Sequence, residues 1–289
     1  MFAVIIHEAD APILIIKTIE TTMDRISLQF NQDNTVATVA LNRPEKHNGV
    51  DWPMLKAVKK VQQQLAKHKN LRAVVLKGEG ASFCAGLDMK SVMADPKTAA
   101  VMYAHLWMPT RNIYQSWSMG WRDLGVPVIA QIHGNCFGAG IQLALGADIR
   151  VCTPDAQLSI LEAKWGLIPD MGGGALLREL LPLDVAKELT MTGRMLDGEQ
   201  AKTLGLVTHV SADPAAHVDA LIKEILARSP DSVAAGKFMM QRIWGIDENA
   251  HLTQERRWQR RLLGFKNQRI SVLKNSKSPT VPFAKRQIR

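Results

Sequence analysis

The stretch VPVIAQIHGNCFGAGIQLALGADIRVCTPDAQLSILEAKWGLIPDMGGG, residues 126–174, decides the fold. Its small-residue turn Gly138-Ala139-Gly140 opens a predicted short helix, and three glycines open a second predicted helix over residues 172–181. Three apolar, β-favouring runs predict strands, at 126–133, 149–153 and 157–161. Strands that alternate with helices in this way predict the α/β class.

The sequence before this stretch continues the alternation. Residues 35–41 and 71–77 are β-rich and predict two further strands. Between them, Asp51 is a predicted helix N-cap, followed by Pro53 and by apolar residues at helical spacing. Residues 95–125 are expected to be helical. They carry three tryptophans that either line an acyl pocket or pack in the core: Trp107, Trp117 and Trp121.

After Pro182 the sequence becomes mainly helical. Asp184 and Asp197 are predicted N-caps, and residues 206–210 predict one last short strand. Helices are predicted from Pro214 onward. The chain therefore divides into three parts, an N-terminal extension over 1–22, a core domain over 23–213 and a helical C-terminal region with a basic tail over 214–289.

The composition is that of a globular protein with one large core. Apolar residues make up 46% of the 289 residues and charged residues 22%. No apolar run has the length of a membrane span, so we expect no membrane association. The N-terminus is apolar, but Glu8 and Asp10 interrupt it and no basic segment precedes it, which disfavours a signal peptide.

Cysteine usage and charge bear on location and partners. Cys84, Cys136 and Cys152 have no paired spacing, so we expect neither disulfides nor a metal site, and a cytoplasmic location. The net charge of +9 concentrates after His251, where Glu255 is the one acid. This basic tail is either a solvated surface or a contact for a partner that carries phosphates.

Few side chains in the opening stretch suit acid–base chemistry beside glycine-rich turns. Glu162 and Asp170 are the carboxylates, and Gln142 is their neutral neighbour. The backbone N–H groups of the turns can face a ligand oxyanion. Cys84 is a candidate nucleophile or a buried thiol, and His133 is a catalyst or a turn histidine; in both cases we favour the structural role.

An ordered set of motifs resembles the crotonase superfamily, also called the enoyl-CoA hydratase/isomerase family. The likeness covers about residues 25–245, and its motifs are Asn42-Arg43-Pro44 with Asn48, FCAGLDMK at 83–90, PVIAQIHGNCFGAGIQLALGADIRV at 127–151, GLIPDMGGG at 166–174, LTMTGRMLDGEQAKTLGLV at 189–207 and Ala235-Gly236-Lys237. The resemblance implies a spiral of ββα units, a helical C-terminal trimerisation region, and trimers that pair into hexamers. It also implies an acyl-CoA substrate and no separate cofactor, because coenzyme A enters with the substrate.

The resemblance also implies roles for single residues. The matching oxyanion-hole donors are the backbone N–H groups of Ala85 and Ala139. Residues expected to contact CoA are Lys46, Cys84, Gly86, Leu87, Asp88, Gly138 and Lys237. Hydratases of the family use two glutamates, and their positions here hold Gln142 and Glu162. Because an amide cannot take up a proton at neutral pH, Gln142 argues against hydration by two carboxylates.

Asp170 lies eight residues after Glu162, an arrangement similar to that of the dienoyl-CoA isomerases. The alternative is that Asp170 only caps the following helix. We therefore favour an isomerase that moves a double bond. One alternative is an enoyl-CoA hydratase of fatty-acid β-oxidation. The other is an RNA-binding or non-catalytic CoA-binding protein on this scaffold, although we do not expect nucleic acid as a partner.

Overall fold

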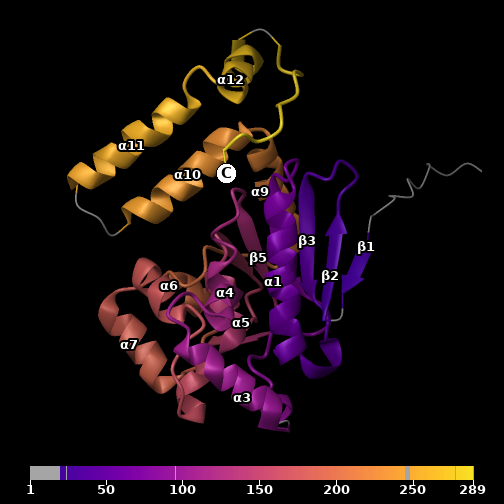
Figure 1. The fold of residues 1–289 in the computed structure, drawn as a ribbon, viewed down its shortest axis with the longest axis vertical. Helices are drawn as coiled ribbons and strands as arrows, with labels where there is room; N and C mark the ends of the chain where they lie inside the picture. Colours follow the sequence, from indigo (N-terminus) through magenta and orange to yellow (C-terminus); the bar gives the residue numbers. More distant parts are fainter. Residues whose placement is uncertain (1–19, 24, 95, 245–247, 277, 289) are drawn as a thin grey trace, which may run out of the picture.

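The computed structural model describes residues 20–23, 25–94, 96–244, 248–276 and 278–288. Its centre is a seven-stranded sheet in the order β1-β2-β3-β4-β5-β7-β9 (Figure 1). Pairing is antiparallel from β1 to β3 and parallel from β3 onward. The strands are β1 Glu20–Met23, β2 Ile26–Phe30, β3 Val36–Leu41, β4 Ala73–Gly78, β5 Val128–Ile132, β7 Ile149–Cys152 and β9 His209–Val210. The predicted α/β class is confirmed.

Helices cover both faces of this sheet, and strand alternation explains how. Val74 and Leu76 of β4 join the larger apolar cluster beneath α1 (Trp52–Lys67) and α4 (Ile113–Met119). Their neighbours Ala73 and Val75 point the other way and pack against α9 (Pro214–Leu226). The parallel strands are thus buried on both faces, as their continuous apolar runs predicted.

A second, two-stranded parallel sheet carries the turns singled out in the sequence. It pairs β6 (Asn135–Phe137) with β8 (Gln157–Ser159), and Cys84 adds a bridge to Cys136. The helix α5 (Ala139–Leu145) follows β6, and the 3-10 helix η3 (Leu161–Trp165) follows β8. The next helix, α6 (Gly173–Leu180), is the predicted glycine-opened helix.

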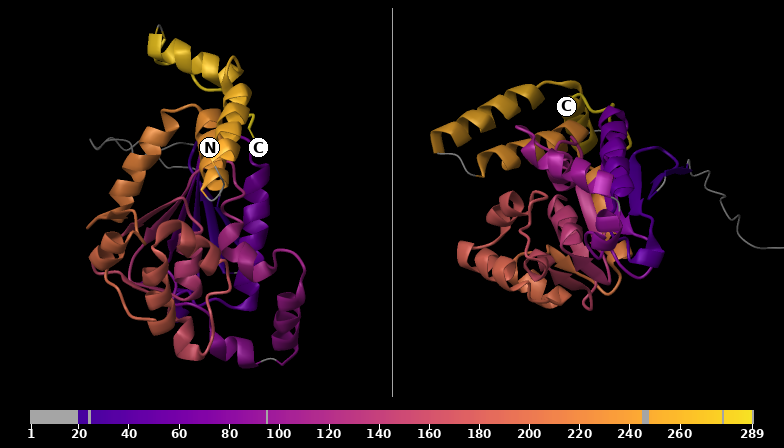
Figure 2. Two further views of the ribbon diagram at one scale, coloured as in Figure 1. Left: turned by 90° about the vertical axis from the view of Figure 1, so that its left-hand side faces the viewer. Right: turned by 60° about the horizontal axis from the view of Figure 1, so that its bottom comes forward.

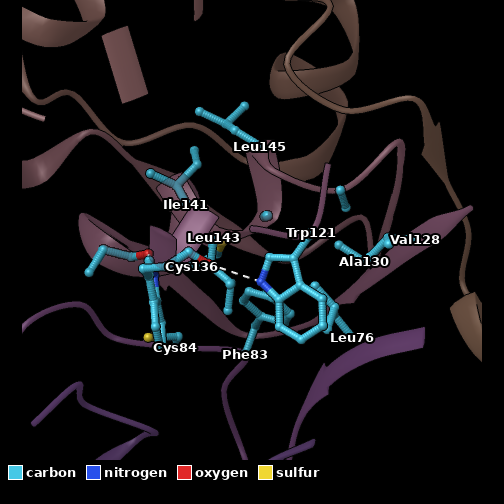
Figure 3. Packing of buried hydrophobic residues seen from close by; sticks show 14 of the residues in the cluster. Leu76, Phe83, Cys84, Trp121, Val128, Ala130, Cys136, Ile141, Leu143 and Leu145 are labelled. Atoms are coloured by element: carbon cyan, nitrogen blue, oxygen red, sulfur yellow. Dashed lines mark hydrogen bonds between the residues drawn. The ribbon is translucent and has the colours of Figure 1, made fainter. Parts of the chain in front are cut away.

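The tryptophans of the region 95–125 divide between core and surface. Trp121 is fully buried and packs beside Phe83 among apolar side chains that include Leu76 and Leu143 (Figure 3). Trp117 is equally buried, and its indole Nε1 donates to the carbonyl of Ala139 over 2.8 Å. Trp107, by contrast, is 76% exposed.

The prediction of one helix over 95–125 is wrong in its continuity. The segment forms α3 (Pro96–Ala104), the 3-10 helix η2 (His105–Trp107) and α4. Pro109 disfavours helical conformation at the residue before it, and Asn112 starts α4 afresh with a capping box to Gln115.

The predicted caps of the next helices meet different outcomes. Asp197 caps α8 (Gly198–Leu204), which Gly205 ends in the left-handed region at φ 88°, as predicted. The prediction that Asp184 caps a helix is wrong. α7 (Leu183–Thr192) already begins after Pro182, and Asp184 lies in its first turn.

The helices α10 (Pro230–Ile243), α11 (Glu248–Leu262) and α12 (Lys266–Ser276) form a layer that extends beyond the sheet (Figures 1 and 2). Buried Asp231 fixes the tail to this layer by accepting from the backbone N–H groups of Gln287 and Ile288, over 2.6 and 2.9 Å. Among the described residues, no helix combines the length and apolar character needed to cross a bilayer.

The turn after β3 supports the loop that follows β4. Its residues His47 and Asn48 both have positive φ. The buried Asn48 amide accepts from the Arg43 backbone N–H over 2.9 Å and donates to the carbonyls of Glu79 and Ser82, over 2.9 and 2.7 Å. One asparagine therefore satisfies two buried backbone groups and one partly buried one, from two segments.

We expect Asn48→Ala to lower the free energy of unfolding by about 3 kcal/mol, because each buried backbone group left without a partner costs about 1–3 kcal/mol. Urea unfolding measures this. The control is Asn275→Ala, which removes an exposed amide bonded to the Ser271 carbonyl and should change stability by less than about 0.5 kcal/mol. Equal effects of the two variants would contradict the supporting role of Asn48.

Candidate active site

Three parallel segments, the one at Cys84 and the strands β6 and β8, end side by side, and the candidate residues follow their ends. The backbone N–H of Phe137 donates to the carbonyl of Cys84 over 2.9 Å, and that of Gly138 donates to the carbonyl of Ser159 over 3.0 Å. The residues after each segment therefore meet at one edge of the small sheet. They are Gly86 and Leu87, then Ala139, then Glu162.

Glycines are required where these loops touch. Gly86 has φ 95°, and a Cβ there would lie 3.0 Å from the carbonyl oxygen of Phe137 and 3.8 Å from the Ala139 nitrogen. A Cβ on Gly140 would lie only 2.3 Å from the carbonyl oxygen of Cys84. The small residues of FCAG and GAG thus allow two backbone loops to approach each other closely.

The backbone donors differ from those expected from the sequence. The N–H of Ala85 donates to the His47 carbonyl over 2.9 Å, so it is not available to a ligand, and the prediction that Ala85 forms the oxyanion hole is wrong. The residues on either side of Leu87 both bond to Val50: the Gly86 carbonyl accepts from the Val50 N–H, and the Asp88 N–H donates to the Val50 carbonyl. No described residue accepts from the N–H of Leu87 itself.

The second donor agrees with the expectation. Ala139 is the first residue of α5, so its N–H has no acceptor within the helix. No acceptor for it is found elsewhere in the described ranges. Leu87 and Ala139 both line one cavity of ≈ 150 Å³. Two unused backbone donors on one cavity suit an oxygen that gains negative charge.

The two carboxylates and the amide line the same cavity. Gln142 is 1% exposed, and its Oε1 accepts from the backbone N–H groups of Met171 and Gly173, over 2.8 and 3.0 Å. These two donors fix which end of the amide is oxygen. The Nε2 therefore faces Glu162 and donates to its Oε1 over 2.6 Å.

The other oxygen of Glu162 is the unusual atom of the site. Glu162 Oε2 is buried, and no described group donates to it. Burial of the carboxylate raises the pKa of Glu162, the hydrogen bond from Gln142 opposes that rise, and the charge of Asp170 adds to it. A half-buried carboxylate with one free oxygen and a raised pKa is suited to act as a general base near neutral pH.

Asp170 is not a helix cap, so that alternative is wrong. The N-cap of α6 is Gly172, at φ 97°, and no side chain caps the helix. Asp170 lines the cavity with its side chain open to solvent at the rim, while the surrounding cavity wall raises its pKa by desolvation. Tyr114 lies near enough for the charge of Asp170 to raise the tyrosine pKa, although burial is the larger cause.

Of the predicted CoA contacts, Gly86, Leu87 and Gly138 line the cavity and Lys46 is exposed in η1 (Pro44–Lys46). Cys84 does not fit as a contact or as a nucleophile. Its thiol is buried and donates to the Asn48 carbonyl over 3.1 Å, and burial raises its pKa to about 12. Cys84 contributes its backbone to the small sheet.

Lys237 and Asp88 are already paired. The Lys237 ammonium is buried, lies 2.8 Å from Asp148 and donates to two carbonyls, so it is not free for a phosphate and the predicted role is wrong. Asp88 pairs with Arg43 over 2.8 Å. Despite some desolvation, its bonds to Ser91 and Arg43 lower the pKa of Asp88 to about 2. Asp88 thus fixes the loop beside Leu87.

The remaining candidate residues are structural. His133 bonds through Nε2 to the Gly80 carbonyl over 2.8 Å, in the turn role. Among the residues described, no three His, Cys, Asp or Glu side chains are grouped to hold a metal ion. Sequence reasoning missed the apolar wall of the cavity, formed in part by Trp165, Leu167 and Ile168. Its signal was the apolar pattern between Glu162 and Asp170.

We expect Glu162 to titrate above its ordinary pKa of 4.5, and Asp170→Asn to move this titration to lower pH because it removes a repelling charge. Carbon-detected NMR of carboxyl-labelled protein measures the shift, with Glu162→Gln assigning the signal. As a control, Asp219→Asn on α9 should leave the titration unchanged. A Glu162 pKa at or below 4.5 in the wild type would contradict the desolvated site.

Comparison with known proteins agrees with this geometry. A sequence model described as "Enoyl-CoA hydratase/isomerase" matches residues 31–274. The chain is 30% identical over 223 residues to methylglutaconyl-CoA hydratase of Mus musculus, covering 75% of this chain and 69% of that protein. It is 31% identical over 224 residues to the Delta(3,5)-Delta(2,4)-dienoyl-CoA isomerase of Rattus norvegicus, covering 74% and 68%.

Solved structures give the same likeness. The enoyl-CoA hydratase from Bacillus anthracis superposes with a TM-score of 0.81 at 27% identity, covering 90% of this chain and 99% of that chain. A structure from Thermobifida fusca YX, solved in complex with acetoacetyl-CoA, has a TM-score of 0.74 at 29% identity and covers 82% and 94%. The similarity thus includes a neighbour with a bound acyl-CoA.

Proposed function

This chain belongs to the enoyl-CoA hydratase/isomerase family, and on that premise we propose that it is an enoyl-CoA isomerase that moves a carbon–carbon double bond within an acyl-CoA thioester. Glu162 is the proposed proton carrier. The N–H groups of Leu87 and Ala139 are the proposed oxyanion hole. Asp170 assists as a second carboxylate at the cavity rim.

The hydrogen bonding of the Gln142 side chain is the observation that supports this proposal. Both ends of its amide are engaged, the oxygen with two backbone N–H groups and the nitrogen with Glu162. The amide has no basic lone pair that could remove a proton from water. Glu162 is then the one carboxylate deep in the cavity, which is enough for proton transfer between carbons but not for hydration by two carboxylates.

The proposed steps conserve atoms and charge. Glu162 Oε2 removes a proton from C2 of a 3-enoyl thioester, and the electron pair moves onto the thioester oxygen to give a dienolate. The Leu87 and Ala139 donors stabilise that oxygen, and loss of one such donor typically costs about 2.7–4 kcal/mol of barrier. Glu162, now protonated, returns the proton to C4, and the double bond lies between C2 and C3.

Enoyl-CoA hydration, as in fatty-acid β-oxidation, is the second candidate. It is supported by the relatives that are hydratases, such as methylglutaconyl-CoA hydratase. In that case the second Nε2 hydrogen of Gln142 would donate to the water, and Glu162 would serve as both base and acid.

Other expectations remain with the proposal. Coenzyme A enters as part of the substrate, with Lys46 as a candidate for its phosphates. We also propose a cytoplasmic enzyme that assembles into trimers or hexamers. Exposed apolar side chains on and after α7, Leu183, Met191 and Met195, support such contacts between copies.

We expect Glu162→Gln to lower kcat for isomerisation of 3-hexenoyl-CoA by about 10²–10⁴-fold while CoA affinity is unchanged, because only the proton acceptor is lost. Stopped-flow absorbance and CoA calorimetry measure the two effects. Glu224→Gln, an exposed change on α9, is the control and should retain full activity. Retention of more than about a tenth of kcat in Glu162→Gln would refute the role of Glu162.

We expect Gln142→Glu to raise hydration of crotonyl-CoA by about 10-fold or more, because it adds to the cavity a second carboxylate that can take a proton from water. Gln142→Met fills a similar volume without a base and should give no gain in hydration. Mass spectrometry separates the two reactions in both variants, because hydration adds the mass of one water and isomerisation leaves the mass unchanged. If wild type already hydrates crotonyl-CoA at about 10² s⁻¹ or faster, hydration replaces isomerisation as the function.

A further inference from the structure

Large apolar side chains line the cavity between the two carboxylates and are open to solvent. Trp165 is 59% exposed, Leu167 49% and Ile168 71%, and all three contribute to the cavity wall. They belong to η3 and the loop after it, which Gly166 turns at φ 69°. Three adjacent exposed apolar residues beside the carboxylates form a surface that an apolar ligand would cover.

The charges on the cavity wall have one sign. Glu162 and Asp170 are its ionisable residues, and no Lys, Arg or His occurs among its described lining residues. Tyr114, near Asp170, gives its hydroxyl hydrogen to the Met102 carbonyl over 2.8 Å, so this hydroxyl is not donated to a ligand. A second carboxylate on an acyl group would therefore meet like charge and no cation.

We propose that the site selects a bulky, uncharged, apolar acyl group, with Trp165, Leu167 and Ile168 covering its distal carbons, and that it excludes acyl groups with a distal carboxylate. This inference rests on the proposed function, because it needs the thioester carbonyl at Leu87 and Ala139. The acyl chain then extends from Glu162 toward the loop that ends at Asp170.

The first experiment compares two substrates of equal length. They are 3-octenoyl-CoA and the same chain with a terminal carboxylate in place of the methyl group. Loss of substrate is followed by mass and absorbance, so that isomerisation and any later hydration of its 2-enoyl product both count. We expect kcat/KM to be about 100-fold lower for the carboxylate, because its charge meets the like charges of Glu162 and Asp170 and no cation on the described wall. Equal values, or a preference for the carboxylate, overturn the inference.

The second experiment changes the wall. Trp165→Ala should lower kcat/KM for 3-octenoyl-CoA by about 10-fold or more and leave the short 3-butenoyl-CoA within about threefold, since only the distal carbons lose contact. Trp107→Ala is the matched control, because Trp107 is an exposed tryptophan that does not line the cavity. Equal losses on both chain lengths, or no loss, overturn the role of Trp165.

A third variant tests the charge argument by gain of function. Leu167→Lys places a cation on the wall at a half-exposed position and should raise kcat/KM for the carboxylate substrate by about 10-fold or more. No gain in a folded Leu167→Lys variant contradicts the inference. Failure of the proposed function looks different, because no 3-enoyl thioester, including 3-butenoyl-CoA, would then be isomerised by the wild type.

Discussion

The hydrogen bonds of the Gln142 side chain hold the site together. Its oxygen accepts from the Met171 and Gly173 backbones, which fixes the start of α6 against α5, and its nitrogen donates to Glu162 on η3. One buried amide thus joins three elements that come from different parts of the chain. It also donates to Glu162 Oε1, whereas no group among the described residues donates to Oε2. A buried oxygen without a donor costs about 1–3 kcal/mol of stability, which the surrounding hydrogen bonds offset.

The backbone donors depend on a second set of constraints. The parallel pairing of Cys84 with Cys136, and of β6 with β8, brings three chain segments to one edge. Residues 47–50 of the turn then bond to the backbone around Leu87, including the Ala85 N–H, whereas no acceptor for the Leu87 N–H is found within the described part of the chain. Asp88, paired with Arg43, fixes the residue that follows. The proposed oxyanion hole is therefore made by backbone geometry, in which side chains take part only as supports.

Much of the fold could be read from local patterns. Asp51 and Asp197 cap helices as their sequence context indicates, and the buried strands appear as continuous apolar runs. Glu162 was a candidate because it is a carboxylate beside glycine-rich turns, and the resemblance to the family supplied the role of Ala139. Ala85 and Lys237 were assigned incorrectly for a common reason. Whether an N–H or an ammonium is free depends on partners distant in sequence, His47 for Ala85 and Asp148 for Lys237, and no local pattern reports them.

We propose that the amide at Gln142 restricts this site to proton transfer between carbons. The mass of the product formed from 3-hexenoyl-CoA in water enriched in ¹⁸O tests it most directly. We predict a 2-enoyl-CoA product with the mass of the substrate and no ¹⁸O on its acyl chain. A product heavier by one molecule of labelled water, formed at the rate of the absorbance change, would contradict the account.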